Sequence, residues 1–275
     1  MKVVVADVDA QALAALDFDL CARCDATDPA QVNALADQVY ERFGDVGVLF
    51  SNTGIMAGDA SFDTPLAVWN KVMSVTFTAN VVCCNAFVPR MQRQARKRAA
   101  VVLTSSLSGL LNTCAQTGAA YTVAKNATRV YAESLAVDLL RSSPSISVHC
   151  LCPGPVNTPL LRNSRLETGK QSFAFEKDGI NDEVLQNGLQ PSAVAEALFK
   201  GVADGRFYVV VVDPKTSNAS LIAEAMRMQV DVVENGGAVP FGFGAGASDD
   251  AAAAATRTRL FEAFKRGLPK RKPKL

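Results

Sequence analysis

Short apolar runs rich in β-branched residues alternate with longer stretches of helical periodicity along most of this chain. The segment "DPAQVNALADQVYERFG" shows the helical kind: Asp28 suits the N-cap, Pro29 the first helical position, and Gly44 the end. Strands that alternate with helices pair in parallel within one sheet. The pattern therefore predicts an α/β fold. The expected strands are Val3–Ala6 and the runs within "DLCARC", "VGVLF", "AAVVLTSS", "SISVHCLCP" and "RFYVVVVD".

Composition divides the chain into one domain, residues 1–235, and a tail, residues 236–275, where Gly, Ala and Asp accumulate before a basic end. Hydrophobic residues make up 49% and charged residues 20%, which is typical of a globular domain. A net charge of +1 gives no general field that would attract nucleic acid or an anionic membrane. Within the domain, residues 160–190 lack a clear period, and we expect a loop or flap there.

Three sequence features bear on the compartment and on metals. No apolar run approaches the ~20 residues of a membrane span, and no secretory signal pattern opens the chain. Seven cysteines, an odd number, argue against a disulfide framework, and with His149 as the only histidine we expect no metal site. A cytoplasmic location is expected. The alternative is peroxisomal, because the terminal Pro-Lys-Leu is close to a Ser-Lys-Leu address.

The segment "AYTVAKNATRVYAESLA" carries the strongest chemical signal. Tyr121 and Lys125 are four residues apart and share one face of a helix. A tyrosine hydroxyl with a pKa near ~10 is a poor acid or base, but a nearby ammonium favours the phenolate and lowers that pKa. Ser106 closes a predicted strand, and the turns "SNTG" and "CPGPVNTP" follow two others. The carboxyl ends of parallel strands meet at one edge, so these pieces should converge.

With these motifs in this order, residues 2–235 resemble the short-chain dehydrogenase/reductase family. The resemblance implies a Rossmann-like doubly wound sheet and an NAD(P)-dependent oxidoreductase that acts on a small-molecule alcohol or ketone. It implies that Tyr121 is the catalytic acid/base, that Lys125 lowers its pKa and holds the nicotinamide ribose, and that Ser106 binds the substrate oxygen.

The resemblance also implies a set of cofactor contacts. Asp7 and Asp25 match the adenosine end, where a carboxylate binds a ribose 2′-hydroxyl and repels a 2′-phosphate, so NAD is expected over NADP. The full cofactor-binding set is Asp7, Asp25, Asn52, Gly54, Tyr121, Lys125, Gly154, Val156 and Thr158.

One departure from the family concerns the beginning of the chain. The family's first strand, glycine-rich turn and first helix have no counterpart here, and that strand would be central, between the strands at Val3 and Val46. Its loss removes backbone donors for a pyrophosphate and forces the sheet either to close a gap or to expose edges. We interpret the chain as an incomplete version of a longer protein. The alternative is a short protein that handles its cofactor differently. For the function, the alternative is a catalytically silent binding or scaffold protein that has lost the pyrophosphate loop.

A second departure lies in the first long helix, where Thr76 occupies the place of a family asparagine that supports a proton relay. Asn80 lies one turn further on, and whether Thr76 or Asn80 serves the relay stays open. By resemblance, the two long helices, Pro65–Val88 and Ala119–Leu140, pair in a homo-oligomer. Burial within a monomer explains their apolar faces equally well.

Overall fold

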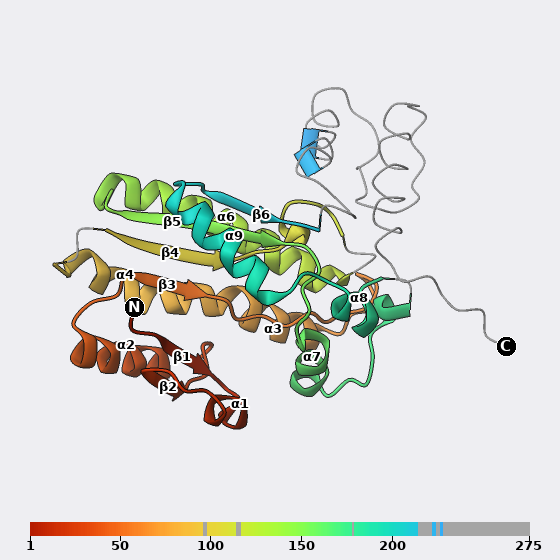
Figure 1. Cartoon of the computed structure of the whole chain (residues 1–275). Helices are drawn as coiled ribbons and strands as arrows, with labels where there is room; N and C mark the ends of the chain where they lie inside the picture. Colours follow the sequence, from red (N-terminus) through yellow and green to blue (C-terminus); the bar gives the residue numbers. More distant parts are fainter. Residues whose placement is uncertain (96–97, 114–116, 178, 214–221, 224–225, 228–275) are drawn as a thin grey trace.

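The computed structural model describes residues 1–95, 98–113, 117–177, 179–213, 222–223 and 226–227. In this part of the chain the strands form two parallel sheets, which confirms the predicted α/β class. One sheet has the order β1-β2 and the other β3-β4-β5-β6 (Figure 1). The strands are β1 (Val4–Asp7), β2 (Leu20–Arg23), β3 (Val48–Ser51), β4 (Ala99–Thr104), β5 (Ile146–Pro153) and β6 (Tyr208–Val211).

The helices fill the intervals between strands, as the alternating pattern predicts. Their bounds are α1 (Ala10–Ala14), α2 (Pro29–Phe43), α3 (Leu66–Met73), α4 (Ala79–Arg93), α6 (Ala119–Ser142), α7 (Leu160–Thr168), α8 (Asp182–Gln186) and α9 (Pro191–Ala203). At α2 the predicted cap is confirmed, since the Asp28 carboxylate accepts from the N–H groups of Ala30 and Gln31. Gly44 ends that helix with φ of 80°, a conformation that glycine adopts without strain.

A π-helical turn, Ser74–Thr78, joins α3 to α4, so that Leu66–Arg93 forms one continuous helix. By length and composition this helix could cross a membrane, with a mean hydropathy of 1.5 in its most apolar window. The sequence had suggested no run of that kind. Half of the window is buried inside the fold, and core helices of globular proteins share this composition.

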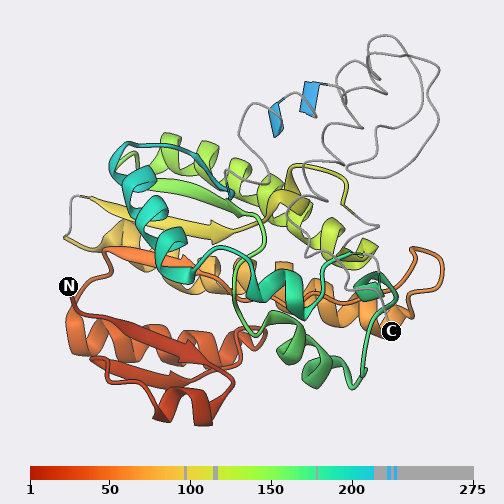
Figure 2. The ribbon, with the colours of Figure 1, turned by 45° about the vertical axis from the view of Figure 1, so that its right-hand side comes forward.

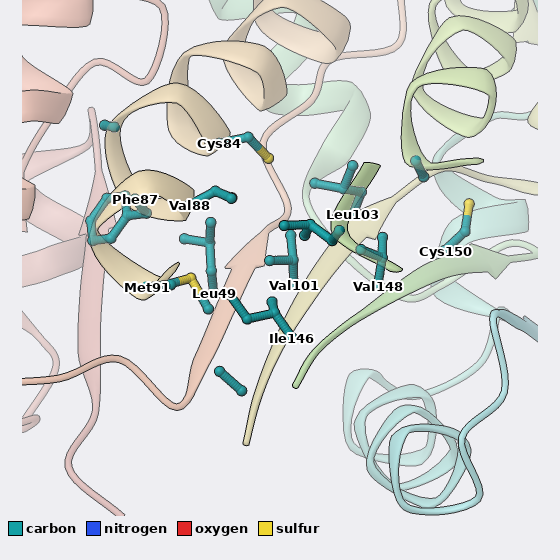
Figure 3. Close-up of a cluster of buried hydrophobic side chains, with 14 of the residues drawn as sticks. Leu49, Cys84, Phe87, Val88, Met91, Val101, Leu103, Ile146, Val148 and Cys150 are labelled. Atoms are coloured by element: carbon teal, nitrogen blue, oxygen red, sulfur yellow. The ribbon is translucent and has the colours of Figure 1, made fainter. Parts of the chain in front are cut away.

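Helices cover both faces of the larger sheet. Every residue of β4 is buried, and its side chains alternate between the faces, as a strand's pleat requires. Val101 and Leu103 belong to the main core, with Phe87 and Met91 of α4 and residues of α2 and α6 (Figure 3). Val102 faces the opposite side, where it packs with Val194 and Leu198 of α9.

The segment expected as a loop at residues 160–190 contains regular structure. It forms α7, a short 3₁₀ turn at Ala174–Lys177, and α8. The sequence pattern was misleading because these helices are short, and their apolar residues are anchored by tertiary contacts: Leu161, Phe173 and Ile180 share one cluster with Val184 and Leu185. The expected helix at 218–233 lies largely outside the described residues, and the tail 236–275 lies wholly outside them.

The β1–β2 pair stands apart from β3, and Figures 1 and 2 show this separation from two directions. Packing still connects the two parts, because α2 lies against α4 and contributes Val32, Ala36 and Val39 to the main core. The β1 and β3 edges therefore face the same cavity without pairing with each other.

Candidate active site

The carboxyl ends of the strands and the first turns of α6 surround one cavity of about 2170 Å³. Ser106 enters it from the end of β4, and Tyr121 and Lys125 enter it from α6. All three side chains are nearly buried, with exposed fractions of 9%, 7% and 4%. The structure thus brings the predicted catalytic set together.

Lys125 is the buried cation of this site. Its Nζ donates a hydrogen bond of 2.7 Å to the Thr104 carbonyl and lies 5.7 Å from the centre of the Tyr121 ring. Removing the ammonium from water disfavours its charged form, and burial lowers the pKa of Lys125 to about 8. Lys125 is therefore close to its titration point in the physiological range.

Burial raises the pKa of Tyr121 to about 12, opposed in part by interaction with the Ser106 side chain. Lys125, which was expected to lower this pKa, is not among the causes of the shift in this structure. The ammonium is committed to the Thr104 carbonyl, and desolvation of the phenolate dominates. Tyr121 is consequently a protonated donor at neutral pH.

The turn after β4 fixes Ser106 against α6. Ser105 donates to the Lys125 carbonyl at 2.8 Å, and Ser106 Oγ accepts from the N–H of Ser108 at 3.2 Å. Gly109 permits this close approach, since a Cβ there would lie 2.7 Å from the carbonyl oxygen of Lys125. The turn after β4 and α6 are therefore held together by a side chain-to-backbone hydrogen bond and by the close packing at Gly109, which limits their relative movement.

Beside Ser106 lies a cluster of buried hydroxyls that sequence reasoning missed. Thr113 donates to Ser108 at 2.7 Å, and its Oγ1 is 3.2 Å from that of Thr117. Thr122 joins the cluster through Thr117 at 3.0 Å. Ser108, Thr113 and Thr117 line the cavity. Their spacing in the sequence shows no period, so only the fold could reveal the cluster.

The turn after β3 carries Asn52 and Gly54 to the cavity wall. A Cβ on Gly54 would lie 3.4 Å from Lys125 Nζ, so glycine keeps this wall open beside the ammonium. Thr76 lies directly behind it, where its hydroxyl accepts from the Ile55 N–H and donates to the Ile55 carbonyl, both at 3.0 Å. Asn80 instead donates to the Thr76 carbonyl at 2.9 Å. Thr76 thus supports the turn, and Asn80 supports Thr76.

The turn after β5 places Gly154, Val156 and Thr158 along another wall of the cavity. The Gly154 N–H donates to Val211 at 2.9 Å, and Val156 forms a bridge with Leu189. This turn is therefore held by β6 and by the segment after α8.

At the far end of the cavity, Asp7 and Asp25 border the space beside β1 and β2. Asp7 accepts from the N–H of Asp9, and Asp25 accepts from the N–H and hydroxyl of Thr27. Arg23 is paired in register with Asp7 and also lines the cavity, with its Nε donating to the Val8 carbonyl at 3.4 Å. The sequence gives no hint of this cation beside Asp7, because the two residues lie on different strands.

These residues fit part of a nicotinamide dinucleotide. Lys125 Nζ beside the open wall at Gly54 suits a ribose hydroxyl, and Asp7 suits the ribose at the other end. Between Lys125 and Asp7, the cavity is lined by residues of β1 and β3. None of the described helices that begin at the cavity follows a glycine-rich turn, so the donors expected for a pyrophosphate are not among the described residues. Within the same residues, no group of three or more His, Cys, Asp or Glu could hold a metal ion.

The side of the cavity near Tyr121 is closed by α7 and α8, and this region is tied to the turn after β3. Ser164 of α7 accepts from the N–H of Met56 at 2.9 Å. Asp59 pairs with Lys170 and accepts from the N–H of Ala174 at 2.9 Å. Leu160, Ile180, Val184 and Leu185 give this side an apolar lining.

The fold is parallel α/β, and the carboxyl ends of its strands bring Ser106, Tyr121 and Lys125 to one cavity. This arrangement is typical of oxidoreductases that bind a nicotinamide dinucleotide. A sequence profile described as short chain dehydrogenase matches residues 2–169. The chain belongs to the short-chain dehydrogenase/reductase family.

Relatives and solved structures agree with this family. A 1-deoxy-11-beta-hydroxypentalenate dehydrogenase of Streptomyces exfoliatus is 35% identical over 170 residues, 58% of this chain and 60% of that enzyme. A CLA biosynthesis dehydrogenase/reductase of Lactiplantibacillus plantarum is 28% identical, over 76% of this chain and 79% of its own. The crystal structure of a short chain dehydrogenase/reductase from Burkholderia phymatum in complex with NAD superposes with a TM-score of 0.70, at 28% identity and 85% coverage of both chains.

Proposed function

We propose that this protein transfers hydride between a nicotinamide cofactor, NAD in preference to NADP, and an uncharged alcohol or ketone. The observation that carries the proposal is the buried arrangement of Tyr121, Lys125 and Ser106 around one cavity. Burial of an ammonium is unfavourable, and a fold that had no use for it would gain stability from an apolar side chain.

The protonation states favour reduction of a carbonyl. A reduced nicotinamide, when bound, supplies the hydride. Tyr121, protonated because its pKa is about 12, donates its proton to the carbonyl oxygen as that oxygen gains negative charge. Ser106 donates a hydrogen bond to the same oxygen, and Lys125 stabilises the phenolate that forms. A proton from water then restores Tyr121.

The cofactor preference rests on Asp7, whose carboxylate suits a 2′-hydroxyl and repels a 2′-phosphate. Arg23 beside it supports the NADP alternative, because a guanidinium binds phosphate well. Asp7→Ser should therefore raise the KM for NADH and lower it for NADPH. An unchanged ratio of the two KM values would assign the preference to other residues.

The substrate is proposed to be uncharged and largely apolar. Near Tyr121 the lining is apolar or carries hydroxyls, and the charged pair Lys71–Glu167 at this wall is joined by a 2.7 Å salt bridge. The hydroxyls of Ser108, Thr113 and Thr117 are placed to bind a second oxygen of the substrate.

Pairing of two copies through α6 is also proposed, because Val123, Val130, Val137 and Leu140 of this helix are exposed. The first three recur at heptad spacing, which suits helix–helix packing.

The function is tested by titrating the purified 275-residue protein with NADH and then measuring reduction of uncharged ketones by loss of NADH absorbance. Tyr121→Phe should bind NADH as tightly as the wild type and reduce ketone about 10²- to 10⁴-fold more slowly. Equal turnover by this variant would refute the catalytic role. If the folded protein does not bind NADH at millimolar concentration, the result would instead support the alternative function, a catalytically silent binding protein.

A further inference from the structure

The buried hydroxyls beside Ser106 form a cluster whose hydrogen bonds have a defined direction. Each serine or threonine hydroxyl carries one proton and accepts through its lone pairs. Thr113 donates its proton to Ser108 Oγ at 2.7 Å, so toward its other hydroxyl neighbours Thr113 Oγ1 is an acceptor. Thr117 Oγ1 also lies 3.1 Å from the Thr113 carbonyl, which only accepts. The protons of Thr117 and Thr122 therefore point toward Thr113, and the proton of Thr113 points toward Ser108.

Ser108 is the residue at which this series of donors ends. Its oxygen accepts from Thr113, and none of the described residues accepts the proton that Ser108 itself carries. Ser108 is 3% exposed and lines the cavity. A buried donor without an acceptor is unfavourable, and the cavity offers space for an acceptor on a ligand.

Two contacts hold Ser108 in place beside Ser106. Its N–H donates to Ser106 Oγ at 3.2 Å at the start of the 3₁₀ turn Leu107–Gly109, so one turn presents two hydroxyls to the cavity. The Asn126 side chain of α6 donates to the Ser108 carbonyl at 2.8 Å and to the Thr122 carbonyl at 3.0 Å. The position of Ser108 relative to Ser106 is thus fixed by the protein before a substrate binds.

We propose that Ser108 determines specificity by donating a hydrogen bond to a second, uncharged oxygen on the carbon next to the substrate carbonyl. Ser106 and Ser108 belong to one turn, which limits the distance between two oxygens that they bind at the same time. The favoured substrates are therefore α-alkoxy ketones, α-hydroxy ketones and α-diketones. The assignment rests on the proposed function, since it takes the carbonyl oxygen to be bound by Ser106 and Tyr121.

The second oxygen needs a lone pair but no proton of its own. Ser108 Oγ already accepts from Thr113, and Ser108 supplies the proton of the new hydrogen bond. An ether or carbonyl oxygen thus suits this position as well as a hydroxyl does. A methylene group in the same place would leave the Ser108 proton unpaired in a buried site, which disfavours the purely aliphatic ketone.

The test compares 2-methoxycyclohexanone with 2-ethylcyclohexanone, two ketones of similar shape that differ by one oxygen in place of one methylene. Initial rates of NADH oxidation by the wild-type 275-residue protein give kcat/KM for each. We expect the methoxy ketone to be favoured about tenfold, because it alone accepts a hydrogen bond from Ser108. The pair 4-methoxycyclohexanone and 4-ethylcyclohexanone carries the same change at a distant carbon and should show no such preference.

Variants connect the preference to the two residues that create it. Ser108→Ala removes the donor, and its ratio of kcat/KM for the two 2-substituted ketones should fall from about ten to about one. A ratio within one variant is independent of any loss of rate that both ketones share. Thr113→Val fills the same space without the hydroxyl that orients Ser108, and it should lower the ratio about threefold. Thr113→Ser keeps this hydroxyl and should restore the ratio, which a purely space-filling role would not predict.

Three results would overturn the assignment and leave the proposed function intact. They are equal kcat/KM for the two 2-substituted ketones in the wild type, an unchanged preference in Ser108→Ala, and an equal preference for the 4-methoxy ketone. If the wild type reduces none of these ketones, the proposed function fails instead. Dissociation constants of the 2-substituted ketones, measured by ligand-observed NMR, then decide the assignment: equal values overturn it, and a tenfold difference that Ser108→Ala removes supports it.

Discussion

Replacing Lys125 with methionine tests the electrostatics of the site through stability alone. Methionine has a similar length and no charge, and fits where an unbranched chain already lies. The pKa of Lys125 is about 8 in the folded protein against 10.5 for a lysine in water. Between these pH values the unfolded chain binds more protons than the folded one. The wild type should therefore become more stable, from this group, as pH rises through the window.

The magnitude follows from the two pKa values. Their difference corresponds to about 3 kcal/mol, which is the unfavourable free energy of burying the charged form below pH 8. The variant also loses the 2.7 Å hydrogen bond to the Thr104 carbonyl, and this adds a pH-independent loss of about 1–3 kcal/mol. Only the first contribution varies with pH.

Urea unfolding at fixed ionic strength, from pH 7 to pH 11, measures the difference. The free energy of unfolding of the wild type minus that of Lys125→Met should rise by about 3 kcal/mol over this range, while groups that do not interact with Lys125 titrate equally in both proteins and cancel. Lys200→Met, which removes an exposed lysine of α9, should show a constant difference. A constant difference for Lys125→Met as well would refute the buried-ammonium interpretation.

Further predictions concern the supports of the site and the core. Thr76→Val should lower the free energy of unfolding by about 1–3 kcal/mol, measured by urea unfolding, because both backbone groups of Ile55 lose their partner; Thr76→Ser keeps the hydroxyl and should recover most of this loss. Leu103→Ala should lower it by about 2–5 kcal/mol by the same measurement, since this side chain is fully buried between β4 and the helices. Gly118→Ala should lower the melting temperature, because its φ of 80° is unfavourable for alanine and the Cβ would lie 3.2 Å from Phe175; an unchanged value would show that the backbone adjusts there.

Local signals were sufficient for much of this protein. The alternation of β-branched runs with helical periods determined the parallel α/β class, and Asp28 with Pro29 determined where α2 begins, because caps depend on a few adjacent residues. The four-residue spacing of Tyr121 and Lys125 placed them on one helical face. The family's sequence order then predicted Ser106 and the turns with Gly54 and Gly154, all of which line the cavity.

The tertiary structure decided what depends on distant neighbours. It raised the pKa of Tyr121, because the surrounding elements remove the hydroxyl from water while the ammonium of Lys125 is hydrogen-bonded to the Thr104 carbonyl. It assembled the hydroxyls of Ser108, Thr113 and Thr117, and it placed Arg23 beside Asp7 across a strand pair. Within the described residues it also left β1 and β3 unpaired with each other. Pairing in the larger sheet joins residues more than 40 positions apart in the chain, and no local pattern encodes such pairing.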